Sequence, residues 1–125
     1  MVCTVDVQGK GTGGPEFVVF NGERLNQGPC VSLAFDGERC LLTEDVILSK
    51  KEGRGEALLS QVHGCFLSPE GKALDGGKTF AITNNSAKTY CSQGFACAGP
   101  KGQFLVVYSE ARGVDDVKIA AQVVK

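Results

Sequence analysis

The chain has 125 residues, with 13 lysines and arginines against 14 aspartates and glutamates and a formal net charge of −1. This length fits one domain with one core, and a composition of 42% hydrophobic and 22% charged residues excludes a disordered or fibrous protein. The balanced charge excludes attraction to nucleic acid through net charge, and no apolar run reaches the roughly 20 residues of a membrane-spanning helix. The first residues do not resemble a signal peptide. We therefore expect a soluble chain, cytoplasmic by default, with no nucleic-acid or membrane partner.

Short apolar runs separated by turn residues predict strands along the whole chain. Each run has about 5–7 residues rich in Val, Leu, Phe and Ile, which is a typical strand length. Asp36-Gly37 and Lys101-Gly102 are typical of tight turns between strands, since Gly adopts the positive φ that such turns require. No segment keeps an amphipathic helical period over ten residues, although Glu44 to Leu59 has room for one helical turn, so we predict an all-β fold. In chain order the runs lie within residues 14–21, 29–37, 39–44, 62–67, 77–84, 94–102, 103–110 and 119–124.

The predicted strands fall into two copies of one pattern. Residues 14–21 match residues 77–84 at an offset of 63, and each later run of the first copy has a counterpart in the second. We therefore predict a single domain, 1–125, made of two four-stranded repeats that span about 5–67 and 68–125. The remaining counterparts are 29–37 with 94–102, 39–44 with 103–110, and 62–67 with 119–124.

The cysteines favour a structural role. Six are spread along the chain without a Cys-x-x-Cys pair, and His63 is the single histidine, so the spacing does not support a zinc site. A chain of this length without an export signal does not need disulfides, and we expect reduced, buried thiols. His63 lies in a strand-like run, which disfavours a catalytic Cys–His pair. We expect no metal, no cofactor and no catalytic residue. The cysteines are Cys3, Cys30, Cys40, Cys65, Cys91 and Cys97.

Both copies resemble a known repeat sequence. Gln103 to Gly113 (QFLVVYSEARG) and Lys118 to Val123 (KIAAQV) resemble the bacterial β-propeller repeat of the form YLVVWSDxRxG…DIYAQRV. The first copy is similar to the same family at Ala34 to Gly37 and at Val62 to Leu74, where VHGCFLSPEGKAL resembles IYGQRVSPDGKVL. The resemblance implies that each copy is a propeller blade, which is a four-stranded antiparallel sheet.

The chain departs from the family pattern at two places. The tryptophan of the second strand is replaced by Tyr108 in one copy and by Thr43 or Glu44 in the other. About eight additional residues enlarge the first copy around Lys50 to Gly55. The first copy therefore fits the repeat less well than the second.

Two blades do not close a ring, because propellers contain about 4–8 blades. The chain stops where it begins within the repeat, so the run within 14–21 would complete a blade whose other three strands come from the end of a chain. We expect a homo-oligomer, and favour a trimer with six blades over a tetramer with eight. The alternatives are a monomeric β-sandwich or barrel of eight strands and a fragment of a longer propeller chain.

The resemblance also implies where a ligand binds. In a propeller, the loops between the second and third strands and those between blades share one face around the central channel. Carboxylates, amides and Arg beside a Tyr are the groups that bind sugar hydroxyls and stack on a sugar ring. The candidate ligand-binding residues in these loops are Glu44, Asp45, Arg54, Asn84, Asn85, Tyr90, Glu110, Arg112, Asp115 and Asp116.

We therefore expect a non-enzymatic binding module, lectin-like in that it binds carbohydrate. One alternative is a hydrolase that uses loop carboxylates, for which Glu44, Glu110, Asp115 and Asp116 are the candidates, because glycosidases work with paired carboxylates. The other alternative is a protein-interaction or structural module whose ligand is another protein.

Overall fold

The described residues of the computed structural model are 31–52, 55–83, 89–100 and 102–125, and of residues 48–52 and 55–59 only the backbone is described. The prediction of an all-β fold is confirmed. Two antiparallel sheets make up this part of the chain, with one short 3-10 turn, η1 (Asp75–Gly77). The strand predicted within 14–21 lies outside the described residues, as do the candidate site residues Arg54, Asn84 and Asn85.

The first sheet is an antiparallel meander of four strands in the order β1-β2-β3-β4. Asp36 shapes the turn between β1 and β2, because its side chain accepts hydrogen bonds from the backbone N–H groups of Glu38 (2.9 Å) and Arg39 (2.8 Å). β4 comes from the second predicted repeat but pairs with β3 of the first, so this sheet joins strands from both repeats. The strands are β1 (Val31–Phe35), β2 (Cys40–Glu52), β3 (Gly55–Leu67) and β4 (Thr79–Ala81).

The second sheet has three described strands in the order β5-β6-β7, all antiparallel. They are β5 (Tyr90–Ala98), β6 (Phe104–Ala111) and β7 (Val117–Val124). The repeat predicts four strands in each sheet, which the first sheet has. Within the described residues the second sheet has three. The run that the repeat assigns to a fourth strand, residues 14–21, lies outside the described residues.

The hairpin formed by β2 and β3 corrects the loop that the sequence analysis placed between them. Pairing continues without a break from Cys40 opposite Leu67 to Glu52 opposite Gly55. Val46 and Ile47 favour this extension, because β-branched side chains fit the extended backbone better than a helical turn. Glu44 and Asp45, predicted to be loop residues, therefore lie within β2.

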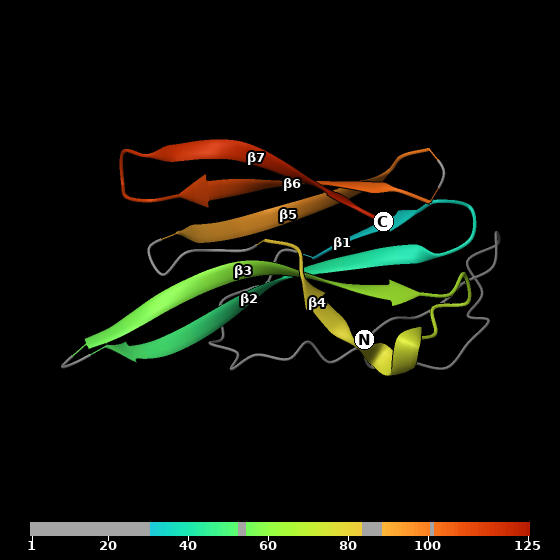
Figure 1. Ribbon diagram of the computed structural model, residues 1–125, viewed down its shortest axis with the longest axis horizontal. Coiled ribbons are helices and arrows are strands. Elements are labelled where there is room, and N and C mark those ends of the chain that lie inside the picture. The colour runs from blue at the N-terminus through green and yellow to red at the C-terminus, as the bar shows by residue number, and fades with distance from the viewer. Residues whose placement is uncertain (1–30, 53–54, 84–88, 101) are drawn as a thin grey trace.

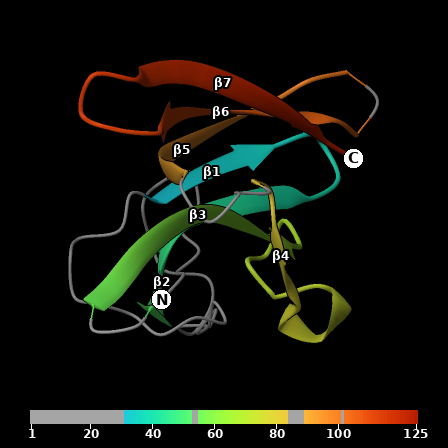
Figure 2. The same ribbon diagram turned by 60° about the vertical axis from the view of Figure 1, so that its left-hand side comes forward.

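The two sheets stack face to face, and the main core lies between them (Figure 1). β5 packs against β1, β2 and β3, and a view turned by 60° keeps the β5–β6–β7 sheet above the first sheet (Figure 2). Leu41 and Val62 from the first sheet and Phe104 and Val106 from the second are fully buried in this core. Burial of these apolar side chains is the main force that holds the sheets together.

The ladders of the two sheets correspond row by row. In the first sheet, Phe35, Cys40 and Leu67 stand opposite one another in the row that adjoins the turn between its first two strands. Ala98, Phe104 and Val124 form the matching row of the second sheet. Counting from these rows aligns the two ladders as far as the bulge of β5 between Ser92 and Phe95, although few residues are identical.

The ends of the sheets are joined by Arg39 in the turn between β1 and β2. Its guanidinium lies 3.9 Å from the centre of the Phe66 ring and donates a hydrogen bond to the carbonyl oxygen of Gly102 (3.2 Å) in the second sheet's corresponding turn. Leu42, Val46, Cys65 and Leu67 form a smaller apolar cluster on the other face of the first sheet. In the described part of the chain neither sheet closes into a barrel.

Gly94 allows β5 to approach β3 closely, and this approach gives a test of the fold. A Cβ atom at position 94 would collide with Cγ1 of Val62, a fully buried side chain. We expect Gly94→Ala to lower the free energy of unfolding by about 1–3 kcal/mol, the usual effect of overpacking. Gly113→Ala is the control, since a Cβ atom there meets nothing within 4 Å. Urea unfolding measures both, and an unchanged midpoint for Gly94→Ala would contradict the stacking of β5 on β3.

Candidate functional site

Asp45, a predicted ligand-binding residue, is bound to the backbone of the second sheet. Its carboxylate accepts hydrogen bonds from the N–H groups of Gln93 (2.8 Å) and Gly94 (3.4 Å) in β5. These two residues form a β-bulge in which Gln93 has a φ of 58°. Burial raises the pKa of Asp45, and the two N–H donors oppose that shift. The carboxylate therefore holds the bulge in place and links the first sheet to the second.

Two hydroxyl groups extend this polar link. The Thr43 hydroxyl donates to the carbonyl oxygen of Gly94 (3.1 Å), and the Ser32 hydroxyl accepts from the N–H of Ala96 (2.8 Å). The two hydroxyl oxygens are 2.8 Å apart, and since Thr43 donates to Gly94, Ser32 is the donor of this third bond. Ser32 and Thr43 were not among the residues predicted to be functional. The sequence feature that could have identified them is that each is a polar residue within an apolar strand run.

Glu44 lies on the opposite face of β2 from Asp45, because successive side chains of a strand alternate. It is buried and stands opposite His63 in β3. Nε2 of His63 is 3.0 Å from Oε1 of Gln61, and Nδ1 of His63 has no hydrogen-bond partner among the described residues. Burial lowers the pKa of His63, so the neutral imidazole is favoured.

Glu110 and Arg112 are the predicted site residues that the structure brings together. Oε1 of Glu110 lies 3.2 Å from the guanidinium of Arg112 and 3.3 Å from the ammonium of Lys118. The Glu110 side chain is 16% exposed, whereas those of Arg112 and Lys118 are 58% and 52% exposed. Lys118 was not predicted; it stands opposite Glu110 in the ladder between β6 and β7. We call Glu110, Arg112 and Lys118 the charged cluster.

The charged cluster adjoins one buried and one half-buried group of the second sheet. Cys91 stands opposite Glu110 in the ladder between β5 and β6 and is buried. Burial raises the pKa of the Cys91 thiol, and the negative charge of Glu110 raises it further, while a hydrogen bond with Thr83 lowers it. Burial, followed by Cys91 and Glu110, raises the pKa of Tyr108. Cys91 is thus held as a neutral thiol, which is a poor nucleophile.

Tyr90 does not join the charged cluster, contrary to the predicted sugar-binding arrangement. It stands opposite Ala111 and is 40% exposed, so alternation places it on the other face of the sheet from Glu110. Asp115 and Asp116 are exposed in the turn between β6 and β7, which is closed by a hydrogen bond from the N–H of Arg112 to the carbonyl oxygen of Asp116 (2.9 Å). Both aspartates therefore flank the charged cluster.

The structure separates two of the carboxylates considered for hydrolysis. Glu44 belongs to the outer face of the first sheet, whereas alternation puts Glu110 on the face of the second sheet that carries Phe104 and Val106, so these carboxylates do not face each other across one cleft. Among the described residues, no group of three or more His, Cys, Asp or Glu side chains is placed to hold a metal ion.

The described cysteines are all free thiols, namely Cys40, Cys65, Cys91 and Cys97. Burial raises the pKa of Cys40 and Cys65 as it does that of Cys91. Cys97 differs from these three because it is exposed. Cys3 and Cys30 lie outside the described residues.

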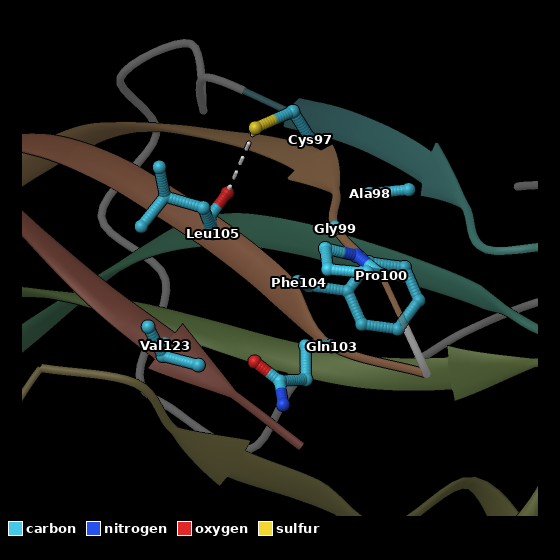
Figure 3. Close-up of a pocket in the computed structure, with 8 residues that line it drawn as sticks. All are labelled: Cys97, Ala98, Gly99, Pro100, Gln103, Phe104, Leu105 and Val123. Atoms are coloured by element: carbon cyan, nitrogen blue, oxygen red, sulfur yellow. Dashed lines mark hydrogen bonds between the residues drawn. The ribbon is translucent and has the colours of Figure 1, made fainter.

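The second sheet has an exposed apolar face that was not predicted. The face that does not contact the first sheet carries Leu105, Ile119 and Val123, which are 38%, 72% and 49% exposed. An open apolar hollow of about 280 Å³ lies beside it at the turn between β5 and β6 (Figure 3). The sequence feature that could have identified this face is the distribution of apolar residues in β6 and β7. Large apolar side chains occur on both faces of these strands, which predicts a sheet covered on both faces.

A scan against models of known protein families, a search of curated proteins and a search of solved structures each found no match to this chain. In the part of the chain that the structure describes, no helix has the length and apolar character needed to cross a membrane.

The bulge fixed by Asp45 provides a prediction about stability. Asp45→Ala leaves the N–H groups of Gln93 and Gly94 without their acceptor, and we expect it to lower the free energy of unfolding by about 1.5–3 kcal/mol. Asp45→Asn keeps one acceptor oxygen and should lose less. Asp115→Ala in the exposed turn is the control and should leave the denaturation midpoint unchanged. If Asp45→Ala unfolds at the wild-type midpoint, the carboxylate does not support the bulge.

His63 predicts how stability depends on pH. Its pKa is lowered from 6.5 by burial in the folded state, so the unfolded state takes up the proton first as the pH falls. The free energy of unfolding should therefore decrease as the pH drops below about 6.5, until the folded state is protonated as well. His63→Gln should remove this decrease. Unfolding by urea at a series of pH values measures it, and parallel profiles for the two proteins would contradict the burial of a neutral imidazole.

Proposed function

We propose that the chain is a non-enzymatic binding module built from propeller-type repeats. The support is the stacking of two antiparallel meanders whose ladders correspond row by row. Consecutive units of a repeat protein stack in this way, since each unit buries its apolar faces against its neighbours. Such an architecture presents its turns at the two ends of the sheets, where a ligand can be bound without disturbing the core.

The charged cluster is the observation that carries this proposal. Glu110 holds Arg112 and Lys118 by ion pairs at the end of β6 and β7, which orders their side chains before a ligand arrives. Both cations are half-exposed, so their remaining N–H groups are free to face solvent, and Asp115 and Asp116 add exposed acceptors in the adjoining turn. Half-exposed donors beside exposed acceptors suit hydroxyl-rich ligands, so carbohydrate is the ligand class we propose.

The test is a glycan array probed with the wild-type chain, followed by calorimetry with the best sugar. We expect Arg112→Ala to weaken binding at least about tenfold, because it removes a charged donor worth roughly 1.5–3 kcal/mol. Glu110→Gln should weaken binding less, since it releases the cations without removing them. Lys72→Ala, in the turn after β3, is the control for the loss of a surface charge. An array on which no sugar binds, or equal affinity for Arg112→Ala and wild type, would refute carbohydrate binding at this cluster.

A second candidate function is protein binding, and the exposed apolar face of the second sheet favours it. Phe95 adds to Leu105, Ile119 and Val123, and is itself 58% exposed. Soluble monomers seldom expose several large apolar side chains on one sheet face, and such faces usually contact another protein. This function uses a different surface from the charged cluster, so the two proposals stand or fall separately.

A further inference from the structure

Two aromatic rings lie exposed along β5 on the outer face of the second sheet, which is the face turned away from the first sheet. Tyr90 stands opposite Ala111 and is 40% exposed. Phe95 stands opposite Val107 and is 58% exposed. Ala111 and Val107 alternate in β6 with residues that face the core, so they and their partners in β5 belong to the outer face. Both rings are therefore accessible from one side of the sheet.

The bulge in β5 places the two rings on the same face. An odd number of positions separates Tyr90 from Phe95, so a regular strand would turn them to opposite faces. The extra residue of the bulge, between Ser92 and Phe95, brings Phe95 back to the face of Tyr90. Asp45 of the first sheet holds this bulge in place by its hydrogen bonds to the backbone. The carboxylate thus sets the direction of an exposed ring.

A pair of hydroxyl groups lies between the two rings. Ser92 and Ser109 stand opposite each other in the row between those of the rings, on the same outer face. The Ser109 hydroxyl donates to the carbonyl oxygen of Ser92 (3.1 Å), and the two hydroxyl oxygens are 3.1 Å apart. Because the Ser109 proton is used on the carbonyl, Ser92 is the donor between the hydroxyls. A hydroxyl has a single proton but more than one lone pair, so the pair keeps acceptor positions and no donor.

The outer face carries no charge along its three strands. The charged residues within β5, β6 and β7 are Glu110 and Lys118, and alternation places both on the inner face with Phe104. A phosphate or carboxylate bound on the outer face would meet no cation there and no free proton of the serine pair. Bases of a nucleic acid also stack on aromatic rings, but its phosphates require cations, so this face does not suit a nucleic acid.

We propose that a neutral oligosaccharide binds along β5 at four residues that we call the β5 strip, namely Tyr90, Ser92, Phe95 and Ser109. The electron-rich faces of the two rings attract the C–H groups on the apolar faces of sugar rings. Between the rings, the acceptors of the serine pair receive protons from sugar hydroxyls. The ligand class rests on the first proposed function, carbohydrate binding, but the β5 strip is a different surface from the charged cluster.

The spacing of the rings indicates a ligand of several sugar units. From Ala111 to Val107, the residues opposite the rings, β6 advances roughly 13 Å at about 3.3 Å per residue. This distance exceeds the width of one sugar ring, so a monosaccharide reaches only one of the two aromatic side chains. An oligosaccharide reaches both rings and passes the serine pair between them. Its affinity should therefore rise with chain length.

The first test compares neutral and acidic glycans of different lengths on an array and measures the best neutral oligosaccharide by calorimetry. Neutral glycans should bind, and longer ones should bind more tightly than their monosaccharides. Tyr90→Ala and Phe95→Ala should each weaken binding about tenfold, because each removes an apolar contact with a sugar. Tyr90→Phe should recover most of the affinity lost in Tyr90→Ala, since it keeps the ring. Val117→Ala is the matched control, because Val117 is 59% exposed on the same face in β7 but lies outside the β5 strip.

Tyrosine fluorescence then locates the bound sugar. The chain contains no tryptophan and two tyrosines, of which Tyr90 lies on the outer face and Tyr108 packs against the core on the inner face. In Tyr108→Phe the emission comes from Tyr90 alone, and it should change when the neutral oligosaccharide binds. In Tyr90→Phe the emission comes from Tyr108, and it should stay constant with the same ligand.

Wild-type affinity for the neutral oligosaccharide in both Tyr90→Ala and Phe95→Ala, each shown to be folded by circular dichroism, would overturn binding at the β5 strip. If either variant is unfolded, the emission of Tyr90 in Tyr108→Phe decides, and an emission that does not respond to the bound ligand overturns the proposal.

The array separates this inference from the proposed function. If acidic glycans alone bind and Arg112→Ala weakens their binding, the β5 strip is refuted and the charged cluster stands. If the ring variants lose affinity for the neutral ligand and Arg112→Ala does not, the β5 strip stands and the charged cluster is refuted. An array on which no glycan binds refutes both.

Discussion

The structure depends on the contact between two sheets that cannot each bury their apolar side chains alone. β2 and β6 carry large apolar residues on both faces, and the core between the sheets buries one face of each, with Leu41 and Val62 against Phe104 and Val106. A sheet with two apolar faces needs a layer on each side. The stacking supplies one of these layers, and on the other face of the second sheet Leu105, Ile119 and Val123 stay exposed.

The polar link between the sheets makes that contact specific. Apolar contacts alone let two sheets shift relative to each other at little cost. The hydrogen bonds between the bulge at Gln93 and Gly94 and the side chains of Asp45 and Thr43 form in only one relative position. Gly94 permits a distance at which any side chain would collide with Val62. Packing provides the affinity between the sheets, and these bonds define the register in which they meet.

Much of the fold could be predicted from the sequence, because the turns and apolar runs are local signals. The turn at Asp36 and Gly37 and the strands around Leu41, Phe66 and Leu105 follow from alternation and turn chemistry. The length of the hairpin between β2 and β3 could not be predicted. The charged residues around Lys50 are typical of a loop, but in the structure these residues continue to pair with β3. The sites were predicted less well. Residue type alone does not show that Asp45 accepts a hydrogen bond from the backbone of the other sheet. Nor does it show that Tyr90 and Glu110 lie on opposite faces of one sheet.

The reactivity of the buried thiols reports local opening of the structure. Cys65 lies in the outer cluster of the first sheet, and Cys91 lies in the second sheet beside Thr83. Both are buried and have a raised pKa, so a thiol reagent reaches each of them only when the surrounding strands separate. Because the two cysteines lie in different sheets, their relative reactivity distinguishes the opening of one sheet from the opening of the other. The native chain thus contains two reporters of local unfolding, one in each layer, without any label being introduced.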